Sequence, residues 1–467
     1  MATPVLEAVE SAVRRAHLTS DDLVLIGLSG GTDSLVLTHA LSTLQQREHG
    51  PRTRAIHVDH QLRPESASDA ARVMELARTL EVPVDVLAVD IAEWARAQRQ
   101  GIEAAARAAR YAAIASLARK LDTPWVALGH TRDDQAETVL LRLARGSSLE
   151  GLAGMRWLSE RAVLLQPGEP RNVRLSILRP LLNVSRREIE RYAGMHGLEP
   201  VEDTSNRSPA FRRNVVRLRI LPGLETTVPG ASAAIARTAA ILQDDAGFLD
   251  ALAMEAEPEV IQMIVGMPML AREPARRLHP ALQRRIVAAA ITRAAGDQLH
   301  LTFDRIEALR NAVRNGAVSS RIELGAGFVA IVDYERVAIG RESDIEDALR
   351  RATGLPLMMP GTVVPLDAPV EFDLGNDWRL WAEAPSSPLR WLLRTKQPGD
   401  RMMAPGGETV RLQDWFVNRK VPAYVRDWLP LLTVDGVVRW VAGISPADFE
   451  DEPSGVRTWI RQEGGWG

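Results

Sequence analysis

The sequence predicts an α/β protein with a doubly wound parallel sheet at its N-terminus, a mainly helical middle domain and a small α+β C-terminal domain. Short apolar runs alternate with helical patterns over the first 150 residues, which is typical of a parallel sheet with right-handed crossovers. Helical periodicity then dominates residues 231–315, and alternating strand-like segments fill the last hundred residues. A chain of 467 residues is also too long for one ordinary core.

The first half supplies four strand–helix pairs in order. Each apolar run of five or six residues indicates a buried strand, and each following segment has apolar residues at helical spacing. The first helix of the series begins after a glycine-rich loop, and the last begins near Asp133. We expect strands at residues 23–28, 55–59, 84–89 and 125–129, and helices at 34–46, 65–80, 102–121 and from 133 onward.

After residue 151 the alternation of strands and helices becomes less regular. Residues 176–182 indicate a further strand leaving the sheet, and a serine cap precedes a helix over 185–196. Short strands are expected over 318–340, and a Pro/Gly-rich linker over 355–369 precedes the last module. The predicted domains are 1–222 (catalytic), 223–345 (mainly helical, for substrate specificity) and 370–467 (small, for RNA binding).

Composition is that of a globular protein, with 46% hydrophobic and 25% charged residues. No apolar run is long enough for a membrane span, and the N-terminus does not have the pattern of a signal peptide, so we expect a cytoplasmic protein. The sequence contains no cysteine. Disulfides, thiolate metal sites, iron–sulfur clusters and persulfide chemistry are therefore excluded.

Charge is uneven although the net charge is only -3. Between Arg142 and Arg219 there are 15 arginines and 8 acidic residues, and a second basic stretch runs from Arg390 to Arg426. Two solvated faces of an arginine-rich protein would explain this pattern, as would contact with RNA phosphates. Charge alone leaves both interpretations open.

The hexapeptide Ser-Gly-Gly-Thr-Asp-Ser at residues 29–34 carries the clearest chemical signal. Two consecutive glycines let the backbone approach oxygen atoms closely, and a helix N-terminus adds its dipole, so the loop predicts a pyrophosphate cradle. No Gly-Lys-Ser/Thr follows, so it is not a Walker A loop. Phosphate would not need Asp33, which indicates a magnesium ligand. Residues 57–60 and 130–134 also follow strands, at the edge where such sheets bind ligands.

The loop resembles the PP-loop of the ATP pyrophosphatase superfamily, which has an adenine nucleotide alpha hydrolase-like fold and converts ATP to AMP and pyrophosphate. Further segments resemble the tRNA(Ile)-lysidine synthetase family strongly over about residues 20–222 and again near the C-terminus. They are Ile56–Arg63, Glu103–Tyr111, Gly129–Thr138, Gly151–Met155, Arg179–Leu182, Glu202–Asn206, Arg213–Arg217, Arg394–Arg401 and Leu412–Pro422. One departure is Gly146-Ser147-Ser148, where the family usually has a second glycine.

The resemblance implies an ATP-dependent ligase that forms a C–N bond. ATP would adenylate the C2 oxygen of cytidine 34 in the CAU anticodon of tRNA(Ile). The side-chain amine of free lysine would then attack C2, giving lysidine, AMP and pyrophosphate. The modified base would pair with A instead of G, changing codon reading from AUG to AUA and charging from Met to Ile. ATP and Mg²⁺ are the implied cofactors.

Four side chains are the catalytic candidates. Asp33 and Asp134 are the metal candidates, with Asp133 as the alternative, and an ordinary helix-capping role is weaker for Asp134 because Asp133 can supply the cap. Neutral lysine costs about 4.6 kcal/mol at pH 7. Glu137 is positioned to hold the ammonium and accept its proton, although a surface Glu–Arg pair is the alternative. His130 would contact phosphate or base, or pack within its loop.

Nucleotide and RNA contacts complete the prediction. Arg107 and Arg110 share a helix face, and the remaining RNA candidates lie in the two basic stretches, Arg179 among them. The nucleotide-binding set is Ser29, Gly30, Gly31, Thr32, Asp33, Ser34, Ile56 and His57. The tRNA-binding set is Arg107, Arg110, Arg142, Arg145, Arg213, Arg217, Arg401, Arg419 and Lys420.

Three other interpretations were weighed. A tRNA 2-thiolation enzyme would use the same loop but needs cysteines. An amide-forming ligase such as NAD or GMP synthetase needs no basic stretches, and residues 133–138 argue against it. A non-enzymatic nucleotide sensor would bind ATP and release no pyrophosphate. No membrane and no stable protein partner are implied, and a homodimer is left open.

Overall fold

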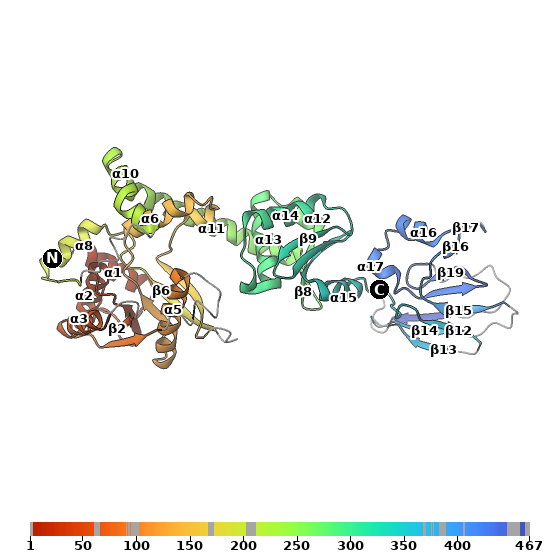
Figure 1. Cartoon of the computed structure of the whole chain (residues 1–467), viewed down its shortest axis with the longest axis horizontal. Coiled ribbons are helices and arrows are strands. Elements are labelled where there is room, and N and C mark those ends of the chain that lie inside the picture. The colour runs from red at the N-terminus through yellow and green to blue at the C-terminus, as the bar shows by residue number, and fades with distance from the viewer. Residues whose placement is uncertain are drawn as a thin grey trace. The chain divides into compact units, whose positions relative to one another are not determined.

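The structure is a computed structural model that describes residues 3–59, 66–89, 91, 94, 102–166, 172–201, 212–367, 370–374, 376, 378–382, 389–404, 407–445 and 458–462. The chain divides into two compact units, Met1–Gly247 and Phe248–Gly467, called here the N-terminal and C-terminal units. Figure 1 shows their elements along the chain. The predicted boundaries at 222, 345 and 370 remain predictions.

The N-terminal unit is built on a six-stranded sheet of order β3-β2-β1-β4-β6-β5. The first five of these strands pair in parallel, and only β5 runs antiparallel, against β6. Chain order reverses at β1, which lies between β2 and β4, so the switch point expected for a ligand site is at the end of β1. The strands are β1 Leu23–Gly27, β2 Arg52–Asp59, β3 Val84–Ala88, β4 Trp125–Ala127, β5 Leu158–Leu164 and β6 Asn172–Leu178.

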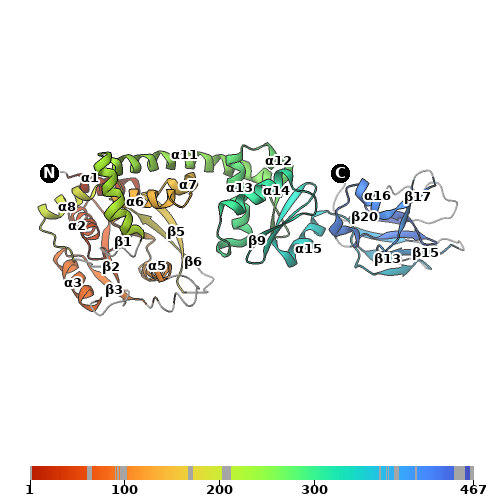
Figure 2. The same cartoon turned by 45° about the horizontal axis from the view of Figure 1, so that its top comes forward.

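Helices cover both faces of this sheet (Figure 2). One core combines α1, α2 and α8 with Val24 and Ile26 of β1, and the other packs α5 against Leu25 and Ile56. Because successive strand residues point to opposite faces, the unbroken apolar run of β1 is buried on both sides. The helices are α1 Pro4–Arg15, α2 Thr32–Gln46, α3 Ser66–Thr79, α5 Ile102–Lys120, α6 Arg132–Leu143, α7 Leu149–Leu152 and α8 Arg186–Met195.

The doubly wound sheet is confirmed, with one correction at its far edge. The segment expected to leave the sheet at residues 176–182 instead contributes β6, which pairs in parallel with β4. Strand β5 was not predicted and adds the antiparallel edge. The unit continues through α9 Arg212–Val215, a π-helical turn η2 Val216–Ile220, and α10 Leu221–Thr227. Helix α11 Ala231–Val260 includes the division between the units.

The C-terminal unit begins with a five-stranded sheet of order β7-β8-β11-β10-β9, packed with four helices. Residues 231–315 were expected to be helical, with breaks near Pro258 and Pro280, and this was wrong at β7–β8, where Val265 and Gly266 adopt positive φ in a hairpin turn. The elements are β7 Ile261–Ile264, β8 Met267–Ala271, α12 Arg272–Arg277, α13 Pro280–Ala295, η3 Gly296–Gln298, α14 Phe303–Asn315, β9 Arg321–Gly325, β10 Phe328–Val332, β11 Arg336–Arg341 and α15 Glu342–Ala352.

The last module is strand-rich, as expected. It contains a six-stranded sheet of order β12-β15-β18-β19-β16-β17 and a three-stranded sheet of order β13-β14-β20. No helix within the described ranges has the length and hydropathy to cross a bilayer. The elements are β12 Val363–Pro365, β13 Val370–Asp373, β14 Trp378–Ala382, β15 Trp391–Arg394, β16 Arg401–Met403, β17 Thr409–Arg411, α16 Leu412–Asn418, α17 Ala423–Arg426, β18 Leu431–Val434, β19 Val437–Val441 and β20 Thr458–Gln462.

Candidate active site

The glycine-rich loop joins β1 to α2 at the switch point. Gly30 has φ +89°, a conformation that favours glycine, and its carbonyl accepts a hydrogen bond from the Val201 amide at 3.0 Å. The Ser34 hydroxyl donates to the Gly31 carbonyl at 2.9 Å and accepts from the Ser29 amide at 3.2 Å. No side chain caps the N-terminus of α2. The loop is therefore braced internally while the first-turn amides of α2 lack a side-chain partner, the arrangement used for anions.

Gly129, at the end of β4, sets the distance between this loop and the next strand. A Cβ added there would lie 2.9 Å from the carbonyl carbon and oxygen of Asp33 and 3.0 Å from the Ser34 nitrogen. These are backbone atoms, which cannot move away as a side chain can. Gly129 belongs to the motif at residues 129–138, but no role was predicted for it from the sequence. Its position at a strand end was the signal that could have indicated a close approach to the loop.

Asp33 is the least compensated carboxylate of the site. Burial, reinforced by the negative charges of Asp134 and Asp133, raises its pKa from 3.8 to about 6, although Arg186 and Arg217 act in the opposite direction. Across the described residues, no cluster of three or more histidine or acidic side chains forms a ready metal site. Asp33 thus offers one oxygen donor group beside the anion cradle.

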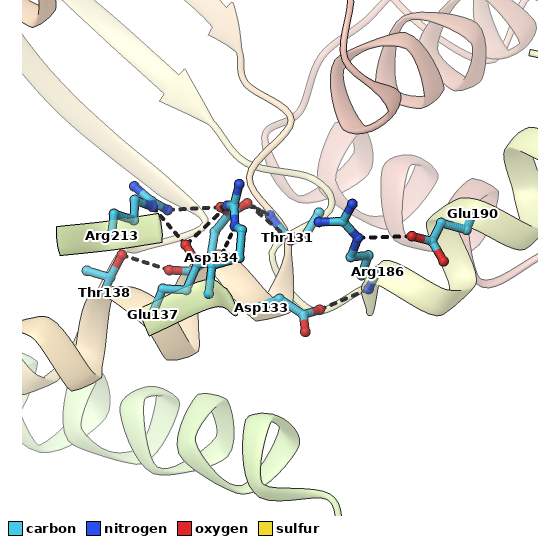
Figure 3. A network of polar contacts seen from close by, with 9 residues as sticks. Thr131, Asp133, Asp134, Glu137, Thr138, Arg186, Glu190 and Arg213 are labelled. Carbon is cyan, nitrogen blue, oxygen red and sulfur yellow. Dashed lines mark hydrogen bonds and ion pairs between the residues drawn. The ribbon is translucent and has the colours of Figure 1, made fainter. Parts of the chain in front are cut away.

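The two acids at the start of α6 have roles opposite to those expected. Asp134, not Asp133, forms the capping box of α6: its Oδ2 accepts from the Thr131 amide at 2.8 Å and from the Thr131 hydroxyl at 3.1 Å. Asp133 instead accepts from the Arg186 amide at 2.9 Å, at the N-terminus of α8 (Figure 3). The assumption that Asp133 would spare Asp134 from capping was wrong.

Glu137 is the most deeply buried acid of the site, with a side chain only 1% exposed. It lies one turn beyond Asp134, and both carboxylates accept hydrogen bonds from Arg213 and Arg217, which follow about 80 residues later in the chain. Figure 3 shows Arg213 beside Asp134 and Glu137. The alternative of a surface Glu–Arg pair was half right, because Glu137 is paired with arginine but is not at the surface. Two residues expected to contact RNA and two expected to be catalytic thus form one cluster, called here the carboxylate–arginine cluster.

The distances in this cluster are those of charge-assisted hydrogen bonds. Arg213 donates from Nε to Glu137 Oε2 at 2.8 Å and from Nη2 to Asp134 Oδ1 at 2.9 Å. Arg217 donates from Nε to Glu137 Oε1 at 2.6 Å and from Nη2 to Asp134 Oδ1 at 2.8 Å and Glu137 Oε2 at 3.1 Å. Every oxygen of the two carboxylates therefore accepts at least one hydrogen bond.

Two of the predicted site residues are histidines: His130 follows β4, and His57 lies near the end of β2. The buried Nδ1 atom of His130 has no hydrogen-bond partner among the residues that the structure describes, and burial lowers the pKa of His130 from 6.5 to about 4. Its imidazole is therefore neutral at pH 7 and can pair with a ligand atom. His57 is held by a contact of 2.9 Å between its Nδ1 and the Leu28 carbonyl, whereas Ile56 packs in the core beside α5. Roles for His57 and Ile56 in nucleotide binding remain predictions.

Arg142, like Arg213 and Arg217, is an expected RNA contact whose guanidinium is used within the protein. It donates to the carbonyls of Gly151 and Gly154 at 2.8 and 3.0 Å, and so fixes the loop after α7. Gln135 holds the same loop through two hydrogen bonds to Met155, a role that the sequence did not reveal. The remaining members are exposed and stay candidates for RNA contact: Arg107, Arg110 and Arg145.

Arg179 also has an internal role, at the end of β6. Its Nη1 donates to the Arg156 carbonyl at 2.8 Å and to the Ser159 hydroxyl at 2.9 Å, and the residue is buried. Its Nε has no hydrogen-bond partner. Most of this guanidinium therefore supports the β5–β6 edge and is not displayed to RNA.

The C-terminal basic stretch separates into buried and exposed parts. Arg394 pairs with Asp400 at 2.7 Å, and both side chains are buried, so this motif is structural. Arg401, Arg419 and Lys420 are exposed. Arg419 stacks over the Trp415 ring at 4.1 Å, and Arg401 donates to the Thr409 carbonyl at 2.6 Å. The exposed cations fit the expected RNA contacts, which remain predictions.

Comparison with known proteins gives the family. A model of the PP-loop domain matches residues 4–224, and a model of the TilS substrate C-terminal domain matches residues 392–461. The tRNA(Ile)-lysidine synthase of Symbiobacterium thermophilum is 35% identical over 98% of this chain and 97% of its own length. The chain belongs to the tRNA(Ile)-lysidine synthase family. The tRNA(Ile)-lysidine synthase of Dehalococcoides mccartyi is 30% identical over 98% of both chains.

Solved structures give a weaker match. The U34-tRNA thiolase NcsA from Methanococcus maripaludis is 18% identical, with a TM-score of 0.42, and the match covers 51% of this chain and 78% of that chain. Family membership accounts for the motif set, since the two matched domains contain the glycine-rich loop, the carboxylate–arginine cluster and the C-terminal basic stretch.

Proposed function

We propose that the chain is an ATP-dependent ligase that forms lysidine at cytidine 34 of tRNA(Ile) with a CAU anticodon, in the cytoplasm. The observation that supports this most is the position of the buried Glu137–Asp134 pair beside Asp33, at the edge that carries the glycine-rich loop. A pyrophosphate cradle and anions able to hold an ammonium are the two elements that the reaction requires.

The loop and α2 bind the phosphates of ATP. Backbone amides and the hydroxyls of Ser29 and Thr32 donate to oxygens on which negative charge develops as pyrophosphate leaves. His130 is neutral at pH 7 and offers an unpartnered ring nitrogen to the nucleotide or the base. These groups orient the C2 oxygen for adenylation and help to exclude water.

Mg²⁺ fits Asp33 better than Asp134. Asp33 is crowded by like charges, which a divalent cation would relieve, whereas both oxygens of Asp134 already accept hydrogen bonds. When bound, Mg²⁺ neutralises phosphate charge, and it commonly uses one or two carboxylates together with substrate phosphates. Asp33 would supply the protein ligand, and ATP phosphates together with water would supply the others.

Glu137 receives the substrate lysine. Its carboxylate holds the ammonium and accepts one proton, after which the neutral amine attacks C2 and AMP leaves. Asp134 stabilises the same cation. In the C-terminal unit, the exposed cations Arg401, Arg419 and Lys420 contact a second part of the tRNA.

The test combines ATP, labelled lysine and an isoleucine tRNA transcript with a CAU anticodon. Label should enter this transcript, with release of AMP and pyrophosphate, and should not enter a transcript in which C34 is changed to U. Incorporation that persists with U34, or that continues at full speed after Asp33→Ala, would contradict the proposal.

A further inference from the structure

The carboxylate–arginine cluster already contains the cations that its acids require. Two carboxylates, Asp134 and Glu137, face two guanidiniums, Arg213 and Arg217, so the charges balance without any substrate. The proposed function, on which this inference rests, brings a third cation to Glu137. A third cation among two anions, in a site where one acid is almost fully buried, would be strongly disfavoured.

The imbalance is removed if one arginine leaves when lysine enters. Arg213 is the weaker partner of Glu137, because it makes two of the five hydrogen bonds from these guanidiniums, one of them to Glu137 against two from Arg217, and its side chain is 37% exposed. Arg217 makes three, is 27% exposed, and is also attracted by Asp33.

We propose that Arg213 occupies, in the lysine-free protein, the position taken by the substrate ammonium during the reaction. Lysine binding is then a cation exchange: Arg213 Nε leaves Glu137 Oε2, the ammonium replaces it, and Arg217 stays. Arg213 thus acts as a gate that keeps the buried Glu137 compensated until lysine arrives.

The exchange has a consequence for ligand chemistry. A position that holds a guanidinium in the resting protein accepts guanidinium compounds as well as ammonium compounds. A guanidinium is not a nucleophile at neutral pH, because it stays protonated. Small guanidinium ligands should therefore occupy the vacated position without reacting and compete with lysine.

The experiment measures lysine KM in the full chain with the C34 transcript. If Arg213 closes the site about nine-tenths of the time, its removal should lower lysine KM about tenfold, because apparent affinity falls with the open fraction. Arg213→Ala is the main variant, and Arg213→Gln, which keeps most of the chain length without the charge, is the second should the first fail to fold. Arg219→Ala is the matched control, because Arg219 is an exposed arginine on the π-helical turn that directly follows the helix of Arg213.

A second measurement titrates millimolar guanidinium chloride into Arg213→Ala. Guanidinium should compete with lysine and return KM toward the wild-type value, with Arg219→Ala behaving as wild type throughout. An unchanged or raised lysine KM in both Arg213 variants would overturn the inference, as would a raised tRNA KM with unchanged lysine KM, which would make Arg213 an RNA contact. Failure of the proposed function is distinguishable, because wild type would then incorporate no lysine.

Discussion

Replacing Asp33 by asparagine should make the N-terminal unit more stable while abolishing its activity. Burial and neighbouring acids raise the pKa of Asp33 from 3.8 to about 6, so the folded state disfavours the charged carboxylate. A raised carboxyl pKa contributes stability that is present below pH 3.8 and lost as pH rises through 6. Across that interval the folded protein loses up to about 3 kcal/mol relative to the unfolded chain. Asparagine has nearly the same shape and carries no charge.

The assay is native-state hydrogen exchange of peptides from β1 and α2, which reports the unfolding free energy of this unit within the full chain. Asp33→Asn should exceed wild type by up to about 3 kcal/mol at about pH 8 and match it at about pH 4. Asp21→Asn, at an exposed position, is the control and should change neither value. An increment that is equal at both pH values would refute the reasoning, because it would not come from the carboxylate charge.

Three further predictions concern other parts of the structure. Burial lowers the pKa of His130 to about 4, so the contribution of neutral His130 to the free energy of unfolding is present above pH 6.5 and lost as pH falls. His130→Gln should therefore reduce the loss of stability at acid pH, measured by the same exchange assay. Gly129→Ala should destabilise the unit by about 1–3 kcal/mol and raise ATP KM, whereas Gly194→Ala, whose Cβ meets nothing, should do neither. Asp400→Asn should lower the melting temperature of the C-terminal unit by leaving Arg394 buried and unpaired, at a cost of about 3 kcal/mol, whereas Arg401→Ala should raise only tRNA KM.

The sequence predicted the parallel sheet well because its signals are local. Each strand of the first half is a short apolar run, and the glycine-rich loop marks the end of the first one. In strand β5, Glu160 and Arg161 interrupt the apolar residues and leave an apolar run of only three, so its pairing with β6 is what makes it a strand. The β7–β8 hairpin was missed for the opposite reason. Residues 261–271 are apolar nearly throughout, and such a run does not distinguish a helix from buried strands.

At the site, the sequence likewise indicated which residues to examine but not which residues pair with one another. All five residues of this region were predicted from their motifs to be functional: Asp33, Asp134, Glu137, Arg213 and Arg217. Their pairing was not, because Glu137 and Arg213 are 76 residues apart and only the fold brings them together. Sequence also gave no means of deciding which of two adjacent acids caps α6, since Asp133 and Asp134 differ only in helix phase.

The degree of charge compensation separates the acids that suit a metal ion from those that suit a monovalent cation, which residue type alone could not do. Asp134 and Glu137 are neutralised by guanidiniums and are held in one geometry, which suits them to receive and orient a monovalent cation by exchange. Asp33 has nearby arginine charges but forms no ion pair with any residue that the structure describes, and its pKa is raised, so its environment remains too negative for the carboxylate. A divalent cation stabilises most where negative charge is least compensated. Asp33 is therefore the stronger metal candidate, and we expect the metal and the lysine ammonium to use different acids of the same sheet edge.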